Sequence, residues 1–272
     1  MICFPNAKIN LGLNIVSKRE DGYHNLETVF YPIAIKDALE IIPSKDGKDH
    51  FSESGIKVDA APDSNLVIKA LNIFRETHPV PPVEIHLLKK IPFGAGIGGG
   101  SADASFMLKL LNDTFGFDAS DSDLAIKARK LGADCPFFIY NKPLFASGIG
   151  EMFEDVELNL SKYFFVLVKP NIHISTKEAF ALIRPQTPNL SLKEIIKKPV
   201  HEWKDLMYND FEKSIFPQFP DIEKVKLQLY QAGAIYASMS GSGSSVFGIF
   251  EKETSPDNIF PKDYYIWQGQ GM

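Results

Sequence analysis

Alternation of apolar and polar residues predicts a strand near the start of the chain. From residue 8 to residue 16, every second position is apolar, and side chains two positions apart in a strand point to the same face. Lys8 and Asn10 stand at the intervening positions, so we expect both to point to the opposite face. The apolar positions are Ile9, Leu11, Leu13 and Ile15.

Further strands and helices are predicted from the same two periodicities and from turn residues. Strands are expected at residues 28–35, 38–42, 83–88, 163–168, 234–239 and 245–250, and helices at residues 66–77, 124–131 and 222–232. A helix is also expected directly after a glycine-rich segment at residues 92–101, and residues 183–199 are expected to wrap the surface. This mixture predicts an α+β fold, and a division near residue 155 gives domains 1–155 and 156–272.

The glycine-rich segment has the composition of a phosphate-binding loop. Glycine adopts positive φ angles and has no Cβ, so backbone amides can approach an anion closely. The helix that follows begins with unpaired N–H groups and the positive end of its dipole. A tight turn that merely needs glycine is the alternative, but five glycines at a helix start favour the phosphate loop. The residues expected to hold phosphate are Pro92, Gly94, Gly96, Gly98, Gly99, Gly100 and Ser101.

Three familiar phosphate loops fit this segment poorly. A Walker loop needs Gly-Lys-Ser/Thr after the glycines, and none follows. Gly94, Gly96 and Gly99 satisfy the G-x-G-x-x-G spacing of dinucleotide-binding proteins, but Asp118 and Asp121 lie at a predicted helix entry and not at a strand tip. Neither His-Arg-Asp nor Asp-Phe-Gly of the protein kinases occurs.

Charge and composition limit the partners. The chain has 29 basic and 34 acidic residues, a net charge of −5, which does not indicate a nucleic-acid partner. We expect a cytoplasmic protein without a membrane segment, with both cysteines reduced. An anionic nucleotide then needs local positive potential, for which backbone amides, a helix dipole, Mg²⁺ and Lys89 or Lys90 are the candidates.

Residues 5–14, the central glycine loop and residues 237–247 together resemble the three motifs of the GHMP kinases, in order and spacing. The resemblance covers residues 5 to about 250. It implies a two-domain α+β fold with a deep cleft between the domains. Domain 1–155 would carry the ATP loop and the catalytic residues, and domain 156–272 would contribute to the substrate cleft. It also implies ATP as co-substrate, with Mg²⁺.

The segments at residues 21–28 and 132–138 resemble the member of this family that phosphorylates a methylerythritol joined to cytidine diphosphate. The resemblance implies that Asp134 is the catalytic base and Lys8 its partner. Tyr23 would stack on the cytosine, His24 would hydrogen-bond its edge, and Phe180 would close the second face. Asn10 would hold the methylerythritol end with Asp134. Gly241, Ser242 and Gly243 would brace the pocket, while the ligands of Mg²⁺ stay unknown, with Asp103 a possible one.

Each of these assignments has an ordinary structural alternative. Asp134 could simply cap the short element after it, Phe180 could be a core residue, and Tyr23 with His24 could belong to a plain turn. Two other functions stay open, namely another small-alcohol kinase, such as a mevalonate or homoserine kinase, and a regulatory nucleotide-binding module without turnover. The presence of both Lys8 and Asp134 favours an enzyme, which we expect to be a monomer or a weak homodimer.

Overall fold

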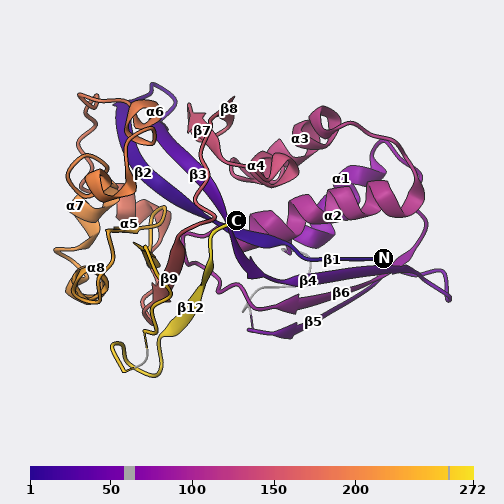
Figure 1. Cartoon of the computed structure of the whole chain (residues 1–272). Helices are drawn as coiled ribbons and strands as arrows, with labels where there is room; N and C mark the ends of the chain where they lie inside the picture. Colours follow the sequence, from indigo (N-terminus) through magenta and orange to yellow (C-terminus); the bar gives the residue numbers. More distant parts are fainter. Residues whose placement is uncertain (58–64, 257) are drawn as a thin grey trace. The chain divides into compact units, whose positions relative to one another are not determined.

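The computed structural model describes residues 1–57, 65–256 and 258–272 (Figure 1). The chain forms two compact units whose segments alternate along the sequence. Unit 1 consists of Met1–Ala7, Ile35–Phe93 and Gly98–Lys142, and unit 2 consists of Lys8–Ala34, Gly94–Ile97 and Pro143–Met272. The division into domains 1–155 and 156–272 stays a prediction.

Unit 1 is built on a four-stranded sheet in the order β1-β4-β6-β5. β4 (Ala38–Pro43) pairs antiparallel with both β1 (Ile2–Cys3) and β6 (Val83–Lys89), and β5 (His50–Gly55) pairs parallel with β6. The predicted strands at 38–42 and 83–88 are therefore confirmed. β5 was not predicted, because its mostly exposed, polar sequence has no apolar alternation.

Helices cover one face of this sheet (Figure 1). α1 (Leu66–Arg75) begins at Asn65, whose side chain accepts the N–H of Val67 as expected of a cap. α2 (Gly99–Phe115) follows the glycine loop, and α3 (Asp121–Arg129) and α4 (Cys135–Tyr140) complete the helical layer. The core between them contains Leu39, Ile41, Ile85, Leu87, Leu71, Phe74, Met107, Leu108 and Leu111.

Two sheets belong to unit 2. The first has the order β2-β3-β7-β8 and consists of β2 (Asn6–Lys18), β3 (His24–Lys36), β7 (Leu144–Ser147) and β8 (Met152–Asp155). The first two residues of β2 and the last two of β3 belong to unit 1. Every residue from 6 to 15 is buried. Both faces of β2 are therefore covered, and its polar side chains must be satisfied inside the protein.

The second sheet of unit 2 is entirely antiparallel, in the order β10-β11-β9-β12. β9 (Phe164–Lys169), β10 (Tyr236–Met239) and β11 (Val246–Phe250) match predicted strands, whereas β12 (Tyr265–Gln270) was not predicted. α8 (Pro220–Gln231) packs on β10 and β11 through Ile222, Val225 and Leu229, and confirms the predicted helix.

Short helices fill the stretch between β9 and α8. They are α5 (Thr176–Phe180), α6 (Leu192–Ile195), the 3-10 helix η2 (Val200–Asp205) and α7 (Phe211–Ile215). Residues 183–199 are mostly exposed or half-buried, whereas Leu192 and Ile195 of α6 are buried. Within the described ranges, no helix combines the length and the apolar character needed to cross a bilayer.

Candidate active site

The polar face of β2 places Lys8 and Asn10 together, as its alternation predicts. Lys8 Nζ donates to Asn10 Oδ1 at 2.7 Å and approaches the carbonyl oxygen of Gly96 at 3.5 Å. Asn10 Nδ2 donates to Thr28 Oγ1 on the neighbouring strand at 2.9 Å, and the Lys8 ammonium lies 4.7 Å from the ring centre of Phe30. Asn10 Oδ1 and Gly96 O are uncharged acceptors, and their bonds orient the ammonium.

The first half of the glycine loop lies beside this lysine. Lys8 N–H donates to Ile97 O at 3.0 Å, and Ser245 N–H donates to Ala95 O at 3.2 Å. Gly96 has a φ of +73°, and a Cβ there would stand 2.1 Å from the carbonyl oxygen of Ser240. A side chain at residue 96 is therefore excluded by both backbone conformation and space.

The third predicted motif meets the same place. Ser240 Oγ donates to Gly96 O at 2.9 Å and accepts the N–H of Asn10 at 3.2 Å. A Cβ on Gly241 would lie 3.0 Å from Gly96 O and 3.3 Å from Asn10 Oδ1, and Gly243 N–H donates to Ser240 O. Ser242 is half-buried in the same turn. Unit 2 thus brings Lys8, Asn10, Gly96 and the Ser240–Gly243 turn together.

The second half of the glycine loop opens α2 in unit 1. Gly98 is the N-cap residue, with a φ of +73°, and it has no side chain to satisfy the first helical amides. Gly99, Gly100 and Ser101 form the first turn, whose N–H groups precede any intrahelical acceptor. Pro92 and Phe93 lead into the loop, and Phe93 is 63% exposed. This arrangement of amides and dipole can hold an anion.

Asp134 occupies the N-cap position of α4, half-buried, yet its side chain makes no capping hydrogen bond. The alternative that Asp134 serves as an ordinary helix cap therefore has no support in its contacts. Cys135 and Pro136 follow it and are buried, which anchors the backbone next to the carboxylate. Burial raises the pKa of the Cys135 thiol to about 11, so this neighbour is a protonated thiol and no competing nucleophile.

Lys89 lies in a buried cluster of charges beneath α2. Its ammonium contacts Asp37, and it donates to Asp103 Oδ2 at 2.6 Å. The other oxygen of Asp37 accepts the backbone N–H groups of Lys90 and Ile91. The Asp37 carboxylate alone balances the charge of Lys89, so this lysine adds no net positive charge to the anion site. The cluster instead ties the end of β6 to the first turns of α2.

The residues present do not form a protein-only magnesium site. Across residues 1–57, 65–256 and 258–272, no group of three His, Cys, Asp or Glu side chains is placed to hold a metal ion. Asp103 is 3% exposed and bonded to Lys89, so it is poorly placed to accept a hydrated cation. We therefore derive no step through a metal ion.

Residues 21–24 form the turn between β2 and β3. Arg19 pairs with Asp21, which also accepts the N–H of Tyr23, and Gly22 has a φ of +87°. This fixed turn leaves the Tyr23 ring 61% exposed. His24 is half-buried and begins β3, and burial together with Lys18 lowers the pKa of its imidazole. A neutral imidazole can both donate and accept a hydrogen bond.

Phe180 stacks on His24, with ring centres 4.8 Å apart and an angle of 23° between the planes. Its edge also meets Phe211 at 4.8 Å, and the side chain packs partly against the core of unit 2. Phe180 therefore has features of both alternatives, a core residue and an aromatic wall. The structure brings His24 and Phe180 together, and their roles toward a ligand stay predictions.

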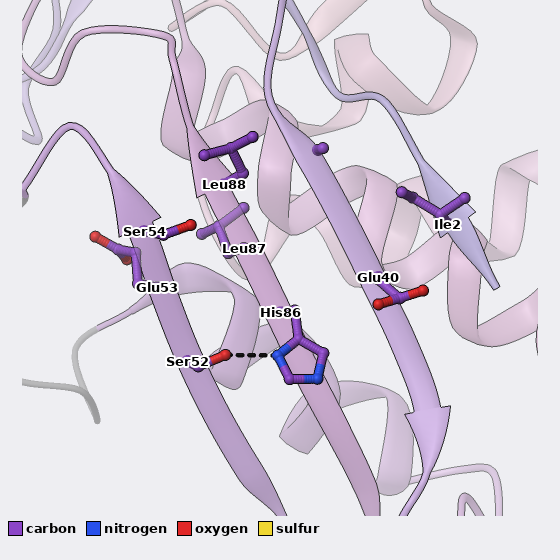
Figure 2. Close-up of a pocket in the computed structure, with 9 residues that line it drawn as sticks. Ile2, Glu40, Ser52, Glu53, Ser54, His86, Leu87 and Leu88 are labelled. Atoms are coloured by element: carbon purple, nitrogen blue, oxygen red, sulfur yellow. Dashed lines mark hydrogen bonds between the residues drawn. The ribbon is translucent and has the colours of Figure 1, made fainter.

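A hollow elsewhere in unit 1 has different chemistry. A pocket of about 360 Å³ lies against β4, β5 and β6, and Ser52 Oγ within it is 2.6 Å from His86 Nδ1. Figure 2 shows the residues that line it. Glu40 and Glu53 also line it. Carboxylates repel a phosphate, and the cavity contains none of the predicted site residues, so it is no candidate for a nucleotide site.

Family models match two parts of the chain. The "GHMP kinases N terminal domain" matches residues 65–142, and the "GHMP kinases C terminal" model matches residues 191–262. The chain therefore belongs to the GHMP kinases. The α+β fold expected from the sequence is confirmed, and so is the resemblance that its three motifs indicated.

Full-length relatives of this chain are named 4-diphosphocytidyl-2-C-methyl-D-erythritol kinase. The protein of that name from Parabacteroides distasonis is 58% identical over 272 residues, 99% of each chain. The one from Bacteroides thetaiotaomicron is 53% identical, over 99% of this chain and 100% of the relative. A crystal structure of 4-(cytidine 5'-diphospho)-2C-methyl-D-erythritol kinase superposes with a TM-score of 0.79 at 31% identity, covering 92% of this chain and 90% of that one. Mevalonate kinase of Methanococcus jannaschii, 14% identical with a TM-score of 0.75, shares the fold over 100% of this chain and 98% of its own.

Ser240 and Thr28 belong to this site, although no role was predicted for either. Both lie within the motifs at residues 237–247 and 21–28, and the neighbouring glycines and apolar residues are consistent with a buried hydroxyl at each. Their partners, Gly96 O and the carbonyl of Gly12, come from distant parts of the chain. No local pattern indicates such pairs.

Proposed function

We propose that this protein transfers the γ-phosphate of ATP to the C2 hydroxyl of 4-diphosphocytidyl-2-C-methyl-D-erythritol, in the non-mevalonate route to isoprenoid precursors. The observation that carries the proposal is the 58% identity to a kinase of that name over 99% of both chains. The buried contacts of Lys8 support it, because they hold an ammonium group beside the glycine loop, and phosphoryl transfer depends on positioned charged groups.

In the proposed step, the C2 oxygen forms a bond to the γ-phosphorus and the bond from that phosphorus to the bridging oxygen breaks, releasing ADP. Asp134 takes up the proton of the hydroxyl, and Lys8 stabilises the negative charge that develops on the oxygens. The glycine loop from Gly94 to Ser101 holds the phosphates through backbone amides and the α2 dipole. Gly241, Ser242 and Gly243 brace this loop through Gly96.

For substrate recognition, we propose that Tyr23 stacks on the cytosine ring and His24 hydrogen-bonds its edge. An exposed tyrosine on a rigid turn suits stacking, because little conformational entropy is lost when it binds. Phe180 is the proposed second aromatic wall. Because it stacks on His24, we propose that it lies beside His24 at the cytosine. Asn10 is the proposed partner of the methylerythritol hydroxyls.

Mg²⁺ is the proposed metal, arriving with the triphosphate, where it supplies charge neutralisation of the phosphate oxygens. We further propose that the enzyme works in the cytoplasm, and as a monomer or a weak homodimer.

The proposal is tested by measuring ADP release with 4-diphosphocytidyl-2-C-methyl-D-erythritol, mevalonate, homoserine and galactose as separate acceptors. We expect turnover with the first and at least about a hundredfold lower kcat/KM with the others. Those acceptors have no cytosine, so the side chains proposed to recognise it would be left without a partner. Faster turnover with mevalonate or homoserine would assign a different substrate. ATP binding without ADP release on any acceptor would indicate a regulatory module.

A further inference from the structure

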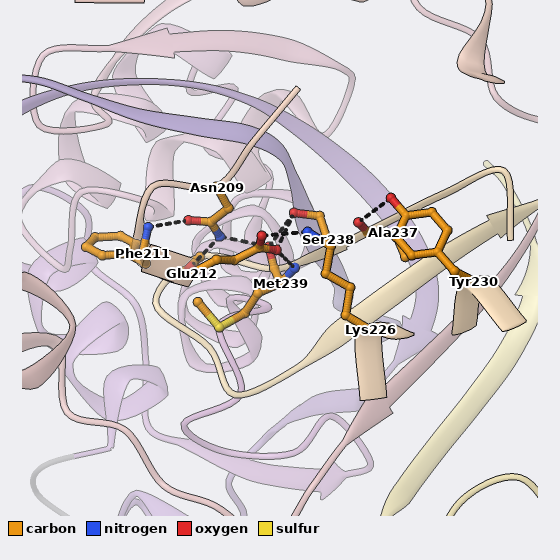
Figure 3. Close-up of polar contacts among 9 residues, drawn as sticks. Asn209, Phe211, Glu212, Lys226, Tyr230, Ala237, Ser238 and Met239 are labelled. Atoms are coloured by element: carbon orange, nitrogen blue, oxygen red, sulfur yellow. Dashed lines mark hydrogen bonds and ion pairs between the residues drawn. The ribbon is translucent and has the colours of Figure 1, made fainter. Parts of the chain in front are cut away.

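A buried asparagine outside every motif, Asn209, holds both sides of Ser240. Its side-chain amide is directed at the third motif, where Nδ2 donates to Met239 O and to Gly241 O, each at 2.8 Å. Its Oδ1 accepts the N–H of Phe211 at 3.0 Å (Figure 3). Asn209 is 1% exposed, so both of its N–H donors are committed inside the protein.

The backbone around Asn209 is fixed to β2. Leu13 N–H donates to Tyr208 O at 2.9 Å, and Asp210 N–H donates to Leu13 O at 2.8 Å. Asp210 Oδ2 accepts the N–H of Ile15 at 2.8 Å. The segment therefore runs along the strand that also carries Lys8 and Asn10, which gives Asn209 a rigid base.

Glu212, one turn further on, holds the preceding residues of the same motif. Its carboxylate accepts Met239 N–H at 2.8 Å, Ser238 Oγ at 3.1 Å and Lys226 Nζ at 2.6 Å (Figure 3). A carboxylate with three donors is a strong anchor in a buried position. The end of β10 and the start of the glycine turn are thus held by two side chains from the beginning of α7.

Ser240 links Asn209 to the candidate active site. The two carbonyls that Asn209 binds belong to the residues before and after Ser240, so they fix the backbone on both sides of Ser240 and with it the position of its Oγ. That Oγ donates to Gly96 O and accepts Asn10 N–H, while Asn10 Oδ1 accepts the Lys8 ammonium. A displacement at Asn209 therefore reaches the glycine loop and Lys8 through one serine.

We infer that Asn209 is a positioning residue for phosphoryl transfer, acting through Ser240 on the glycine loop and on the Lys8–Asn10 pair. The inference about the reaction rests on the proposed function. Small displacements suffice, because a misplacement of about 1 Å remote from the chemistry can cost about a hundredfold in rate.

The test is a double-mutant cycle of Asn209→Asp and Ser240→Ala in the full chain. Asn209→Asp keeps the size and shape of the side chain but replaces Nδ2, which donates two hydrogen bonds, with an oxygen that cannot donate them. We expect each single variant to lower kcat about tenfold or more with KM for ATP changed less than about threefold, and the double variant to be no slower than the slower single one. Multiplied losses in the double variant, or a folded Asn209→Asp with wild-type kcat, would overturn the inference.

Asn159→Asp is the matched control. This exposed asparagine accepts the N–H of Ser161 through its Oδ1, which aspartate also provides, so we expect wild-type kcat. Should Asn209→Asp fail to fold, Asn209→Ser, which retains one hydroxyl donor, takes its place in the same cycle and is judged by the same criterion.

Hydrogen exchange separates this inference from the proposed function. The amides of Ser240, Gly243 and Ser245 donate to Ser245 O, Ser240 O and Ala95 O. Exchange at these three should accelerate in Asn209→Asp and stay unchanged in Asn159→Asp, with no substrate needed. Unchanged exchange in Asn209→Asp refutes the inference whatever the activity, whereas accelerated exchange in a protein whose wild type transfers no phosphate refutes only the proposed function.

Discussion

Among single residues, Asp134 has the most specific proposed role, that of the catalytic base. It occupies the N-cap position of α4 without a capping hydrogen bond, so helix capping does not explain an aspartate at this position. Lys8 differs, because its role is supported by geometry that the alternation of β2 already predicted. The alternation placed Lys8 and Asn10 on one face of the strand, and the two side chains are hydrogen-bonded, whereas the contact with Gly96 joins Lys8 to a distant segment.

We expect Asp134→Asn to lower turnover by at least about a hundredfold, the usual scale for lost acid–base catalysis. ATP affinity should stay nearly unchanged, because the proposed role of Asp134 is toward the acceptor hydroxyl and not toward the nucleotide. Steady-state kinetics and nucleotide binding on the same preparation measure this. Asp118→Asn, at an exposed residue with a φ of +52° that asparagine tolerates, is the control. A variant that retains most of its turnover would exclude Asp134 as the base.

Tyr23→Ala should weaken substrate binding and leave the chemical step intact. An aromatic stacking contact contributes about 0.5–1.5 kcal/mol, so KM for the cytidine substrate should rise up to about tenfold while kcat stays within about twofold. Tyr23→Phe keeps the ring and should behave as wild type. The measurement is a substrate titration at saturating ATP. An unaltered KM in Tyr23→Ala would place the cytosine contact elsewhere.

At the scale of elements, the glycine loop depends on backbone conformation more than on side chains. Gly94, Gly96 and Gly98 all have positive φ angles, and the carbonyl of Gly96 lies against Ser240. The sequence predicted the loop and the helix after it. It did not predict that the third motif packs against Gly96, because the two are 144 residues apart.

Gly96→Ala should abolish activity through the loop. The added Cβ meets Ser240 O at 2.1 Å, in addition to the cost of about 1–2 kcal/mol for a left-handed alanine. Gly47→Ala isolates that second cost, because Gly47 has a similar φ of +75° and no atom lies within 4 Å of the place its methyl group would take. We expect turnover to fall at least about a hundredfold in Gly96→Ala only. Equal activity in the two variants would contradict the close packing.

The buried charged cluster under α2 should make the free energy of unfolding depend on pH. Burial, opposed by Lys89 and reinforced by Asp37, raises the pKa of Asp103 to about 8 from an ordinary value of 3.8. The folded protein then binds more protons than the unfolded one between these values, so the free energy of unfolding falls as pH rises toward 8. The oxygen Oδ1 of Asp103 has no hydrogen-bond partner among the described residues, which fits a carboxyl that keeps its proton.

Asp103→Asn should remove this dependence, because asparagine resembles the protonated acid and does not titrate. Denaturant unfolding from pH 5 to 9 should show the wild type losing stability relative to Asp103→Asn as pH rises, by at most about 1.4 kcal/mol per pH unit. Asp113→Asn, at an exposed position of the same helix, should follow the wild type. Parallel curves for wild type and Asp103→Asn would show that Asp103 ionises normally.

At the scale of the whole molecule, the sequence predicted the elements with strong apolar periodicity and the family. α1, α8 and β6 have one apolar face each. Asn65 caps α1, Gly233 follows α8, and prolines lie on both sides of β6. β5 and β12 escaped prediction because their burial patterns are dominated by exposed or half-exposed positions, so their pairing with neighbours, and not their own pattern, makes them strands.

The motif residues of the candidate site could be proposed from the sequence, whereas the residues that hold them in place could not. Lys8, Asn10 and the glycines were visible as motifs, whereas Asn209 is a single asparagine in a polar stretch. Its importance comes from burial and from two carbonyl partners that lie about thirty residues further along the chain. Local sequence carries no record of such a contact.

Phosphorus NMR of a reaction that contains the protein, ATP, Mg²⁺ and 4-diphosphocytidyl-2-C-methyl-D-erythritol would detect the proposed phosphoryl transfer itself. We expect one new phosphomonoester resonance, from phosphate attached at C2 of the methylerythritol, that grows in equal amount with ADP while the cytidine diphosphate stays intact. Unconsumed ATP, or phosphate attached at any other hydroxyl, would contradict it.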